Sequence, residues 1–179
     1  MNGNLAAGAA VSAADSDFRR PFRDALGHFA SGITVLTGEH DGKRLGMTCQ
    51  SFFSVSLEPP LISVSVSQSS STFPNIRSSG QFCVNVLTAR QRWVSDRFAA
   101  SAEDRWRGLE PAASPAGNPI IPGSLMWIDC TIVAEHLSGD HALVVGEVTA
   151  FDRPQEQSEG PLLYYRGAYR VLRGAEAVI

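Results

Sequence analysis

Residues 61–67 read LISVSVS, and from Ile62 onward apolar and polar side chains alternate. Successive side chains of a strand point to opposite faces, so this alternation predicts a strand with one apolar and one polar face. Pro59 and Pro60 stand directly before it and break the preceding extended segment, residues 54–57. The centre of the chain therefore predicts β-structure with tight connections.

Upstream, residues 33–37 (ITVLT) are β-branched or apolar and predict another strand. Asp41 and Gly42 follow, and this pair tolerates the positive φ angles that a tight hairpin turn requires. A returning strand is expected over residues 45–50. The region therefore predicts a β-hairpin.

An amphipathic helix is predicted before this hairpin. Asp17 is a good N-cap, Pro21 is tolerated in the first turn, and Gly32 is the expected C-terminal stop. The apolar face repeats at helical spacing and consists of Phe18, Phe22, Leu26 and Phe29.

Downstream, strands again outnumber helices. The expected helices are residues 72–78, closed by Gly80, and 91–98. Residues 103–122 carry Pro, Gly and charge and predict a long surface loop. The expected strands are residues 82–87, 126–137, 142–151, 161–164 and 169–172, the second and third joined by a turn at 138–140. This pattern predicts a mainly β fold, an antiparallel barrel with flanking helices.

The composition fits one domain. The chain has 179 residues, of which 44% are hydrophobic, enough to build a core. A formal net charge of −3 gives no reason to expect nucleic acid or an anionic membrane as a partner. Residues 1–17 are rich in Ala, Gly, Ser and Asn, lack the pattern of a signal peptide and predict a disordered tail. The domain is expected over residues 18–179, without a membrane-spanning segment.

Several kinds of site are disfavoured by the sequence. Cys49, Cys83 and Cys130 are too far apart for a zinc or redox motif, which favours reduced, buried thiols in a cytoplasmic protein. The four histidines show no ligand spacing, so no metal site is predicted. The chain has no G-x-G-x-x-G, no Walker A loop, no G-x-S-x-G and no H-E-x-x-H. A nucleotide would therefore bind through another architecture.

Two segments are candidates for a site. Residues 46–61 place hydroxyls, an amide and backbone groups where a strand bends into a loop, and these groups can bond a flat heterocycle and a ribityl chain. The alternative is that these Ser and Thr side chains only fill an outward strand face. In the second segment a turn at 139–140 delivers His141 to the barrel mouth, and Gly146 follows inside a strand, a position typical of a bulge or of close ligand approach. A lone His at a turn is also commonly just solvated.

Taken together, these segments resemble the short flavin reductases that supply two-component flavin-dependent monooxygenases. The resemblance runs from about Phe22 to Leu172 and rests on several stretches in the right order. They are residues 29–37 (FASGITVLT), 46–61 (GMTCQSFFSVSLEPPL), 80–87 (GQFCVNVL), 97–99 (RFA), 139–141 (GDH) and 161–169 (PLLYYRGAY).

The resemblance implies a split β-barrel that forms a homodimer, with flavin near the subunit interface. It places Met47, Thr48, Cys49, Gln50, Ser51 and Ser54 along the isoalloxazine and ribityl chain, with Phe98 also contacting the flavin. It places Ser65, Ser71 and Thr72 toward the phosphate. His141 faces the nicotinamide, and the segment with Tyr165, Arg166 and Tyr169 closes over that side.

The phosphate position has independent support. Ser71 and Thr72 precede the short helix expected at Phe73, where backbone N–H groups and hydroxyls can bind an anion. Simple N-capping by Ser71 or Thr72 is the alternative. Hydride transfer itself is carried by the cofactors, so the protein needs to stack two rings and orient them. His141 is the candidate for orienting the nicotinamide carboxamide.

The predicted activity is NAD(P)H:flavin oxidoreductase, reducing free FAD or FMN for a partner monooxygenase. NADH is favoured over NADPH because no Arg pair is evident for a 2′-phosphate. The alternatives are a non-catalytic flavin carrier or sensor with the same barrel, a purely structural barrel, and split barrels that oxidise pyridoxamine phosphate or handle haem. The last two uses need a basic cluster or an iron ligand, and neither is clear in the sequence.

Overall fold

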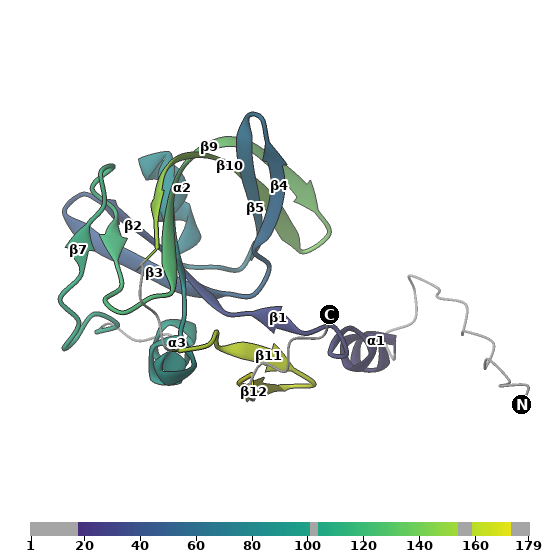
Figure 1. The fold of residues 1–179 in the computed structure, drawn as a ribbon. Coiled ribbons are helices and arrows are strands. Elements are labelled where there is room, and N and C mark those ends of the chain that lie inside the picture. Colours follow the sequence, from purple (N-terminus) through teal and green to yellow (C-terminus); the bar gives the residue numbers. More distant parts are fainter. Residues whose placement is uncertain (1–17, 101–103, 154–158, 173–179) are drawn as a thin grey trace, which may run out of the picture.

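The computed structural model describes residues 18–100, 104–153 and 159–172. Its centre is a seven-stranded antiparallel sheet in the order β3-β2-β6-β9-β10-β5-β4, which curls around one core (Figure 1). β3 and β4 are its two edges, so the barrel is split, and the predicted fold class is confirmed. The strands are β2 (Thr34–His40), β3 (Lys43–Cys49), β4 (Phe53–Leu57), β5 (Pro60–Ser67), β6 (Gln81–Val86), β9 (Met126–Ser138) and β10 (His141–Asp152).

The predicted hairpins form as expected. Asp41 and Gly42 have φ angles of 50° and 70° and join β2 to β3, the positive φ values that an Asp-Gly turn accommodates. The long hairpin of β9 and β10 turns at Gly139, which has a φ of 62°. β4 and β5 form a further hairpin, with a cis peptide between Glu58 and Pro59.

Gly146 of β10 lies at a register shift in the β9–β10 ladder, so the predicted bulge is confirmed. The close approach at this glycine is made by the protein's own core. A Cβ atom at Gly146 would lie 2.7 Å from Phe82 Cζ and 2.8 Å from Cys130 Cβ. Gly146 therefore admits a core side chain, and a ligand is not needed to explain it.

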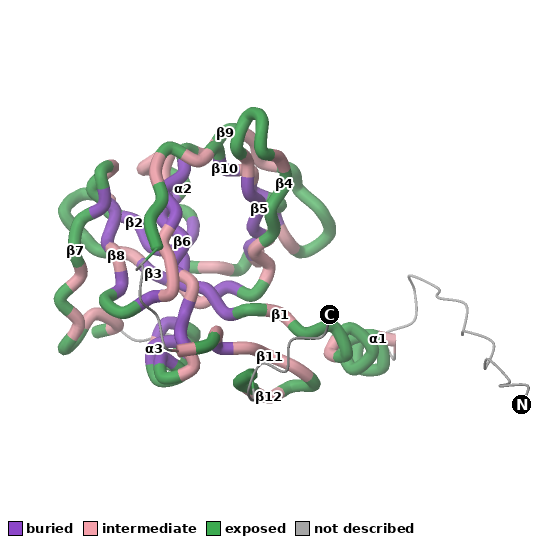
Figure 2. Tube along the Cα trace, in the orientation of Figure 1, coloured by how far each residue is buried: buried purple, intermediate pink, exposed green. Residues whose placement is uncertain are grey.

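Two apolar clusters stabilise the fold. The first fills the inside of the curled sheet and includes Leu36, Val64, Phe82 and Val144. The second lies between the sheet and α3 (Arg92–Ala99), and Val94 and Phe98 of that helix take part in it. Burial of such side chains supplies most of the driving force for folding. In Figure 2 the buried residues accordingly concentrate on the strands.

α2 (Phe73–Ser79) ends at Gly80, whose φ of 72° matches the predicted C-terminal glycine. Its first turn is capped by Ser70, whereas the capping alternative named Ser71 or Thr72. Ser70 Oγ accepts the Phe73 N–H at 3.1 Å, whereas Thr72 makes no side-chain cap bond. A short 3-10 turn, η2 (Ala89–Gln91), precedes α3.

The first helix is shorter than predicted. α1 (Arg19–Leu26) ends at Gly27, and Gly32 lies instead in β1 (Ser31–Gly32). The helix stops early because β1 pairs with β11 (Leu163–Tyr165), which also pairs with β12 (Ala168–Arg170) in a three-stranded sheet. Phe29 is therefore outside the helix and 80% exposed. No residue of α1 is buried, and the helix lies at the surface of the molecule (Figure 2).

The prediction of a surface loop over residues 103–122 is wrong for its second half. β7 (Ala112–Ala113) pairs with β8 (Pro119–Ile120), and Asn118 and Ile121 are fully buried. Buried polar groups of the sheet require partners there: Asn85 Oδ1 accepts the Ile121 N–H at 2.8 Å, and Asp129 Oδ1 accepts from Asn118 Nδ2 at 3.1 Å.

The predicted disordered tail, residues 1–17 with the proposed cap Asp17, lies outside the described residues. Within residues 18–100, 104–153 and 159–172, no helix has the length and apolar character to cross a membrane. The three cysteines, all described, are free and buried, as predicted.

Candidate functional site

The polar segment that follows β3 is held against β5. Thr34 Oγ1 donates to the Cys49 carbonyl oxygen at 2.9 Å, which fixes the end of β3. Ser51 Oγ then accepts the Ser65 N–H at 2.7 Å and donates to the Ser65 carbonyl oxygen at 2.8 Å. Cys49 Sγ lies 3.0 Å from Ser51 Oγ. Ser51 therefore contacts two other predicted cofactor-binding residues, Cys49 and Ser65, which belong to different strands.

His141 belongs to the same region. It lies opposite Ser67 in the β5–β10 ladder, two residues along β5 from Ser65. Gln68 ties the turn after β5 to the turn before His141: its Nε2 donates to the Gly139 carbonyl oxygen at 2.8 Å, and its N–H donates to the Asp140 carbonyl oxygen at 3.0 Å. The predicted nicotinamide-side histidine is thus connected to the predicted flavin segment by one strand pair.

The imidazole of His141 is paired with a carboxylate. Its Nδ1 lies 2.7 Å from Asp140 Oδ1. This hydrogen bond, and then the charge of His141, hold the pKa of the exposed Asp140 carboxyl below its usual value, with a smaller contribution from the charge of Arg19.

The region around Ser71 and Thr72 contains a cation that the sequence analysis missed. Arg105 Nη1 donates to Thr72 Oγ1 at 2.8 Å and to the Gly46 carbonyl oxygen at 2.8 Å. A pocket of about 170 Å³ opens beside it. The pocket is lined by Arg44, Leu45, Gly46, Ser71, Thr72, Asn75, Arg105 and Trp106. The sequence does not single out Arg105, because it falls in the segment expected to be a surface loop.

Phe98 does not present its ring to this region. It is 1% exposed and packs edge-on against Trp106, with ring centroids 5.0 Å apart. Gly46 makes room for it: a Cβ there would lie 2.3 Å from Phe98 Cε1. The buried ring of Phe98 therefore packs against Gly46, where the polar segment begins. It is not exposed to a ligand.

Tyr169 is connected to the flavin segment through α3. Its hydroxyl donates to Asp96 Oδ1 at 2.9 Å and lies 2.9 Å from Ser95 Oγ, while Thr48 Oγ1 donates to the Ser95 carbonyl oxygen at 2.7 Å. Burial is the largest cause that raises the pKa of Tyr169, and Asp96 adds to it. The β11–β12 hairpin is thereby anchored to β3 through one helix.

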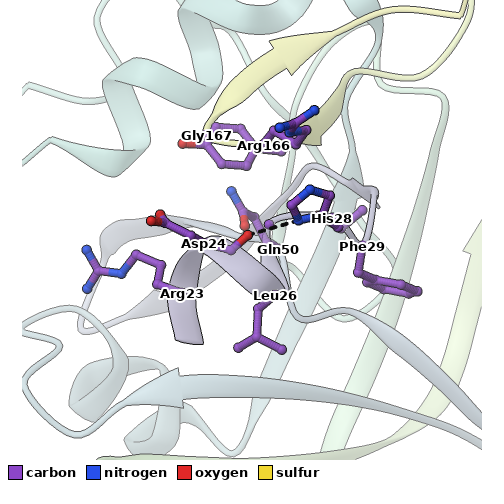
Figure 3. A pocket seen from close by; sticks show the side chains of 11 residues that line it. Arg23, Asp24, Leu26, His28, Phe29, Gln50, Arg166 and Gly167 are labelled. Atoms are coloured by element: carbon purple, nitrogen blue, oxygen red, sulfur yellow. Dashed lines mark hydrogen bonds between the residues drawn. The ribbon is translucent and has the colours of Figure 1, made fainter. Parts of the chain in front are cut away.

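A large cavity adjoins these elements. It measures about 710 Å³ and lies between the end of α1, Gln50 and the β11–β12 turn. Its lining is Arg23, Asp24, Leu26, Gly27, His28, Phe29, Ser31, Gln50, Tyr164, Arg166 and Gly167. Figure 3 shows Arg166 on one side, with Asp24, Gln50 and His28 across from it, and Leu26 and Phe29 directed away. The volume is that of a small-molecule site.

Of the predicted residues, Gln50 and Arg166 line the cavity of about 710 Å³, and Ser71 and Thr72 line the pocket of about 170 Å³. Met47 receives a bond from Ser70 Oγ at 3.7 Å, which brings it beside the turn before α2. Ser54 lies apart from the others in these contacts: it is exposed on the edge strand β4. Tyr165 packs edge-on against His28, with ring centroids 6.4 Å apart. Apart from their charge, nothing in the sequence indicates that three residues of these hollows belong to a site: His28, Asp24 and Arg105.

The donors present fit a flavin nucleotide. Hydroxyls and backbone groups near Ser51 suit the polar edge of a heterocycle, and the guanidinium of Arg105 with the Thr72 hydroxyl suits a phosphate. The thiols do not suit redox chemistry, because burial raises the pKa of Cys49 and raises that of Cys130 to about 12. Among the described residues, no three His, Cys, Asp or Glu side chains gather as a metal site would require.

A split barrel with this polar segment, a histidine-bearing turn and an aromatic hairpin defines the class of flavin reductases. Residues 26–173 match the family described as flavin reductase like domain, and the chain belongs to this family.

Proteins similar to this chain have names that fit this family. The chain is 45% identical over 150 residues to the reductase subunit HsaB of a flavin-dependent monooxygenase from Mycobacterium tuberculosis, covering 84% of this chain and 80% of that protein. A nitrilotriacetate monooxygenase component B homologue from Mycobacterium thermoresistibile superposes with a TM-score of 0.86 at 41% identity over 88% of each chain. The NADH:FAD oxidoreductase SgcE6 of Streptomyces globisporus, solved with NAD and FAD fragments, gives 0.82 at 29% identity, covering 94% of this chain and all of that one.

The predictions of the family, of flavin reduction by NADH and of flavin and NADH as cofactors are confirmed at the level of the family.

Proposed function

We propose that this chain is the reductase component of a two-component monooxygenase, and that its flavin lies along the segment from Met47 to Ser51. The observation that carries this proposal is the pair of hydrogen bonds between Ser51 and Ser65, which holds the segment beside the β5–β10 ladder that bears His141. A bound flavin supplies the acceptor, N5, for the hydride of a dihydronicotinamide.

The protein's own contribution is positioning. The backbone from Gln50 to Phe53 supplies N–H donors for the polar edge of the ring, where negative charge develops on reduction. His141, with its Nδ1 against Asp140, orients the carboxamide of the nicotinamide. Tyr165, Arg166 and Tyr169 form the wall on that side. Thr48 and Cys49 act through their contacts with Ser95, Thr34 and Ser51.

The phosphate end of the flavin belongs in the pocket beside α2. Arg105 supplies the positive charge, Ser71 and Thr72 supply hydroxyls, and Asn75 lines the same hollow. A guanidinium binds phosphate with charge-assisted hydrogen bonds, so its loss should weaken a phosphorylated flavin selectively. In an Arg105→Gln variant we expect the KM for FMN to rise about tenfold, while the KM for riboflavin, which lacks the phosphate, stays near the wild-type value. An equal rise for both flavins would assign Arg105 a purely structural role.

The protein acts as a homodimer in the cytoplasm. Large apolar side chains on outer strand faces support a second copy as partner; they include Val133, Leu137, Leu143 and Phe151, and Phe53 and Leu57 of β4. Free, unpaired thiols are typical of a reducing compartment. Light scattering coupled to size-exclusion chromatography measures the mass in solution, and a monomer would contradict the dimer.

A steady-state assay tests the central proposal. NADH oxidation is followed by absorbance with FAD, FMN and riboflavin as acceptors, and each is repeated with NADPH. We expect turnover that depends on added flavin and is faster with NADH. A carrier or sensor binds flavin without consuming NADH, and a structural barrel binds none, so the assay and a flavin titration separate all three.

Transfer of reduced flavin to an oxygenase requires that the protein release the flavin, so extensive dialysis should remove the yellow colour.

A further inference from the structure

A pocket of about 360 Å³ lies away from the predicted flavin and nicotinamide residues. Its walls come from the β7–β8 hairpin, from the segment that leads into β9 and from the end of β10. Figure 1 shows β7 and α1 on opposite sides of the molecule, so this pocket is separate from the cavity beside α1. Asp152, which lines the pocket, and His141 are the two ends of β10, separated by about 35 Å of strand.

Trp127 and Asp152 are direct partners in the β9–β10 ladder. Side chains of directly opposed residues lie on the same face of a sheet, with Cβ atoms about 5 Å apart. Both residues line the pocket, and so does Glu110, which precedes β7. One hollow thus contains an indole and two carboxylates, which are the charged groups among its described lining residues.

The indole of Trp127 has a face that the protein leaves open. The Arg97 guanidinium carbon lies 4.7 Å from the centroid of the Trp93 ring, and the ring of Trp106 packs edge-on against Phe98. Among the residues that the structure describes, the Trp127 side chain has no comparable ring, cation or hydrogen-bond partner. Because the face of an indole attracts cations, Trp127 offers to a ligand the kind of contact that Trp93 makes within the chain.

The two carboxylates are also available to a ligand. Asp152 Oδ1 accepts the N–H of its neighbour Arg153 at 2.7 Å. In the described parts of the chain no Lys, Arg or His side chain pairs with Asp152 or Glu110, and both residues are exposed. A cation that enters the pocket can therefore pair with them without displacing a cation of the protein.

The apolar wall of the pocket is fixed in place. Ile121 is fully buried, and its N–H donates to Asn85 Oδ1 at 2.8 Å. The Pro122 carbonyl oxygen accepts from Gln91 Nε2 at 2.8 Å. Ile121 and Pro122 line the pocket together with Ile120 of β8. A wall that is already ordered loses little conformational freedom on binding, and its apolar surface suits a hydrocarbon body.

We propose that this pocket binds a small organic cation, an ammonium group attached to an apolar or aromatic body. The ammonium group lies between Glu110 and Asp152 on the face of Trp127, and the body packs on the wall formed by residues 120–122. The volume is at the lower end of the range for small-molecule sites. This binding site goes beyond the proposed function and requires neither flavin nor nicotinamide.

NMR titration of the tryptophan indole N–H groups tests the proposal without an activity assay. The chain has three tryptophans, and the signal of Trp127 is assigned by its loss in Trp127→Phe. Benzylammonium is the probe, and benzyl alcohol is the uncharged molecule of the same shape. We expect benzylammonium to shift the Trp127 signal with a Kd of about 1 mM and to leave the Trp93 signal in place. Benzyl alcohol should bind about tenfold more weakly.

Variants of the two exposed carboxylates test the charge contacts. Glu110→Gln and Asp152→Asn should each weaken benzylammonium binding about threefold and leave benzyl alcohol binding unchanged. Glu147→Gln is the matched control, because it removes an exposed carboxylate from β10 outside the pocket lining.

Three results would overturn the proposal. The first is equal affinity of the wild-type protein for benzylammonium and benzyl alcohol, or no shift of the Trp127 signal with either. The second is wild-type affinity for benzylammonium in both carboxylate variants. The third is displacement of benzylammonium by FMN, which would assign the probe to the flavin segment instead.

Discussion

The hydroxyl of Ser51 satisfies both backbone groups of Ser65, accepting its N–H at 2.7 Å and donating to its carbonyl oxygen at 2.8 Å. Ser51 lies just beyond the edge strand β3, and Ser65 lies in β5 near the other edge of the sheet. The Ser51 side chain thus makes the two hydrogen bonds that a neighbouring strand would make with Ser65. It connects the two edge regions of the split barrel at the position where we place the flavin.

Replacing Ser51 should therefore affect stability and ligand binding together. Ser51→Ala leaves two backbone groups of Ser65 without their partner, and we expect a loss of about 1–2 kcal/mol in the free energy of unfolding, together with weaker flavin binding. Urea denaturation and a flavin titration measure the two effects.

The matched control is Ser78→Ala, which removes an exposed hydroxyl on α2 that donates to the Pro74 carbonyl oxygen. If Ser51→Ala unfolds at the same urea concentration as Ser78→Ala, the bridge does not stabilise the barrel.

Gly46 should not tolerate a side chain. A Cβ at this position would meet the buried ring of Phe98 at 2.3 Å, and that ring is confined by Trp106. We expect Gly46→Ala to lower the free energy of unfolding by about 1–3 kcal/mol.

Gly38→Ala is the comparison in the neighbouring strand, because the nearest side-chain atom there, Ile76 Cγ1, lies 3.4 Å from the added Cβ. Thermal denaturation distinguishes the two variants. Equal melting temperatures would show that Phe98 can move aside.

His141 should matter for the reductant more than for the fold. Its imidazole is partly exposed and bonds only its neighbour Asp140 among the contacts described for it. We expect His141→Ala to lower kcat/KM for NADH about tenfold, equivalent to about 1.4 kcal/mol, with thermal stability unchanged.

His136→Ala, an exposed histidine on β9, serves as its control. Unchanged steady-state kinetics in the His141 variant would remove this residue from the site.

The Asp140–His141 pair predicts a specific pH dependence. The folded pKa of Asp140 lies below its usual value, so the pair stabilises the fold at pH values above the ordinary carboxyl pKa of about 4, and this contribution is lost as the pH falls through the lowered folded pKa. Carbon-detected NMR titration of the Asp140 carboxyl reports it directly. In His141→Ala we expect the pKa of Asp140 to return toward its ordinary value; a titration curve identical to wild type would mean that the hydrogen bond is absent in solution.

Much of the fold was accessible from local patterns. The alternation in residues 61–67, the Asp41-Gly42 turn and the Gly80 helix end each concern neighbours in the chain, and each formed as predicted. The order of motifs likewise sufficed to recognise the family. The two errors arose from contacts between residues far apart in the sequence. The first helix ends early because residue 31 pairs with residue 164. The segment around Asn118 is buried because Asn85 and Asp129 need hydrogen-bond partners.

The amino-acid sequence by itself determined the strands of the seven-stranded sheet, their tight turns and the polar character of the segment from Met47 to Ser51, since period and turn chemistry act over a few residues. Only the tertiary structure brought Arg105 to Thr72, buried Phe98 under Gly46, and placed Asp24 and Arg166 around one cavity. Those contacts depend on how separate elements pack and register, and a side chain's charge or ring carries no information about which distant partner it will meet.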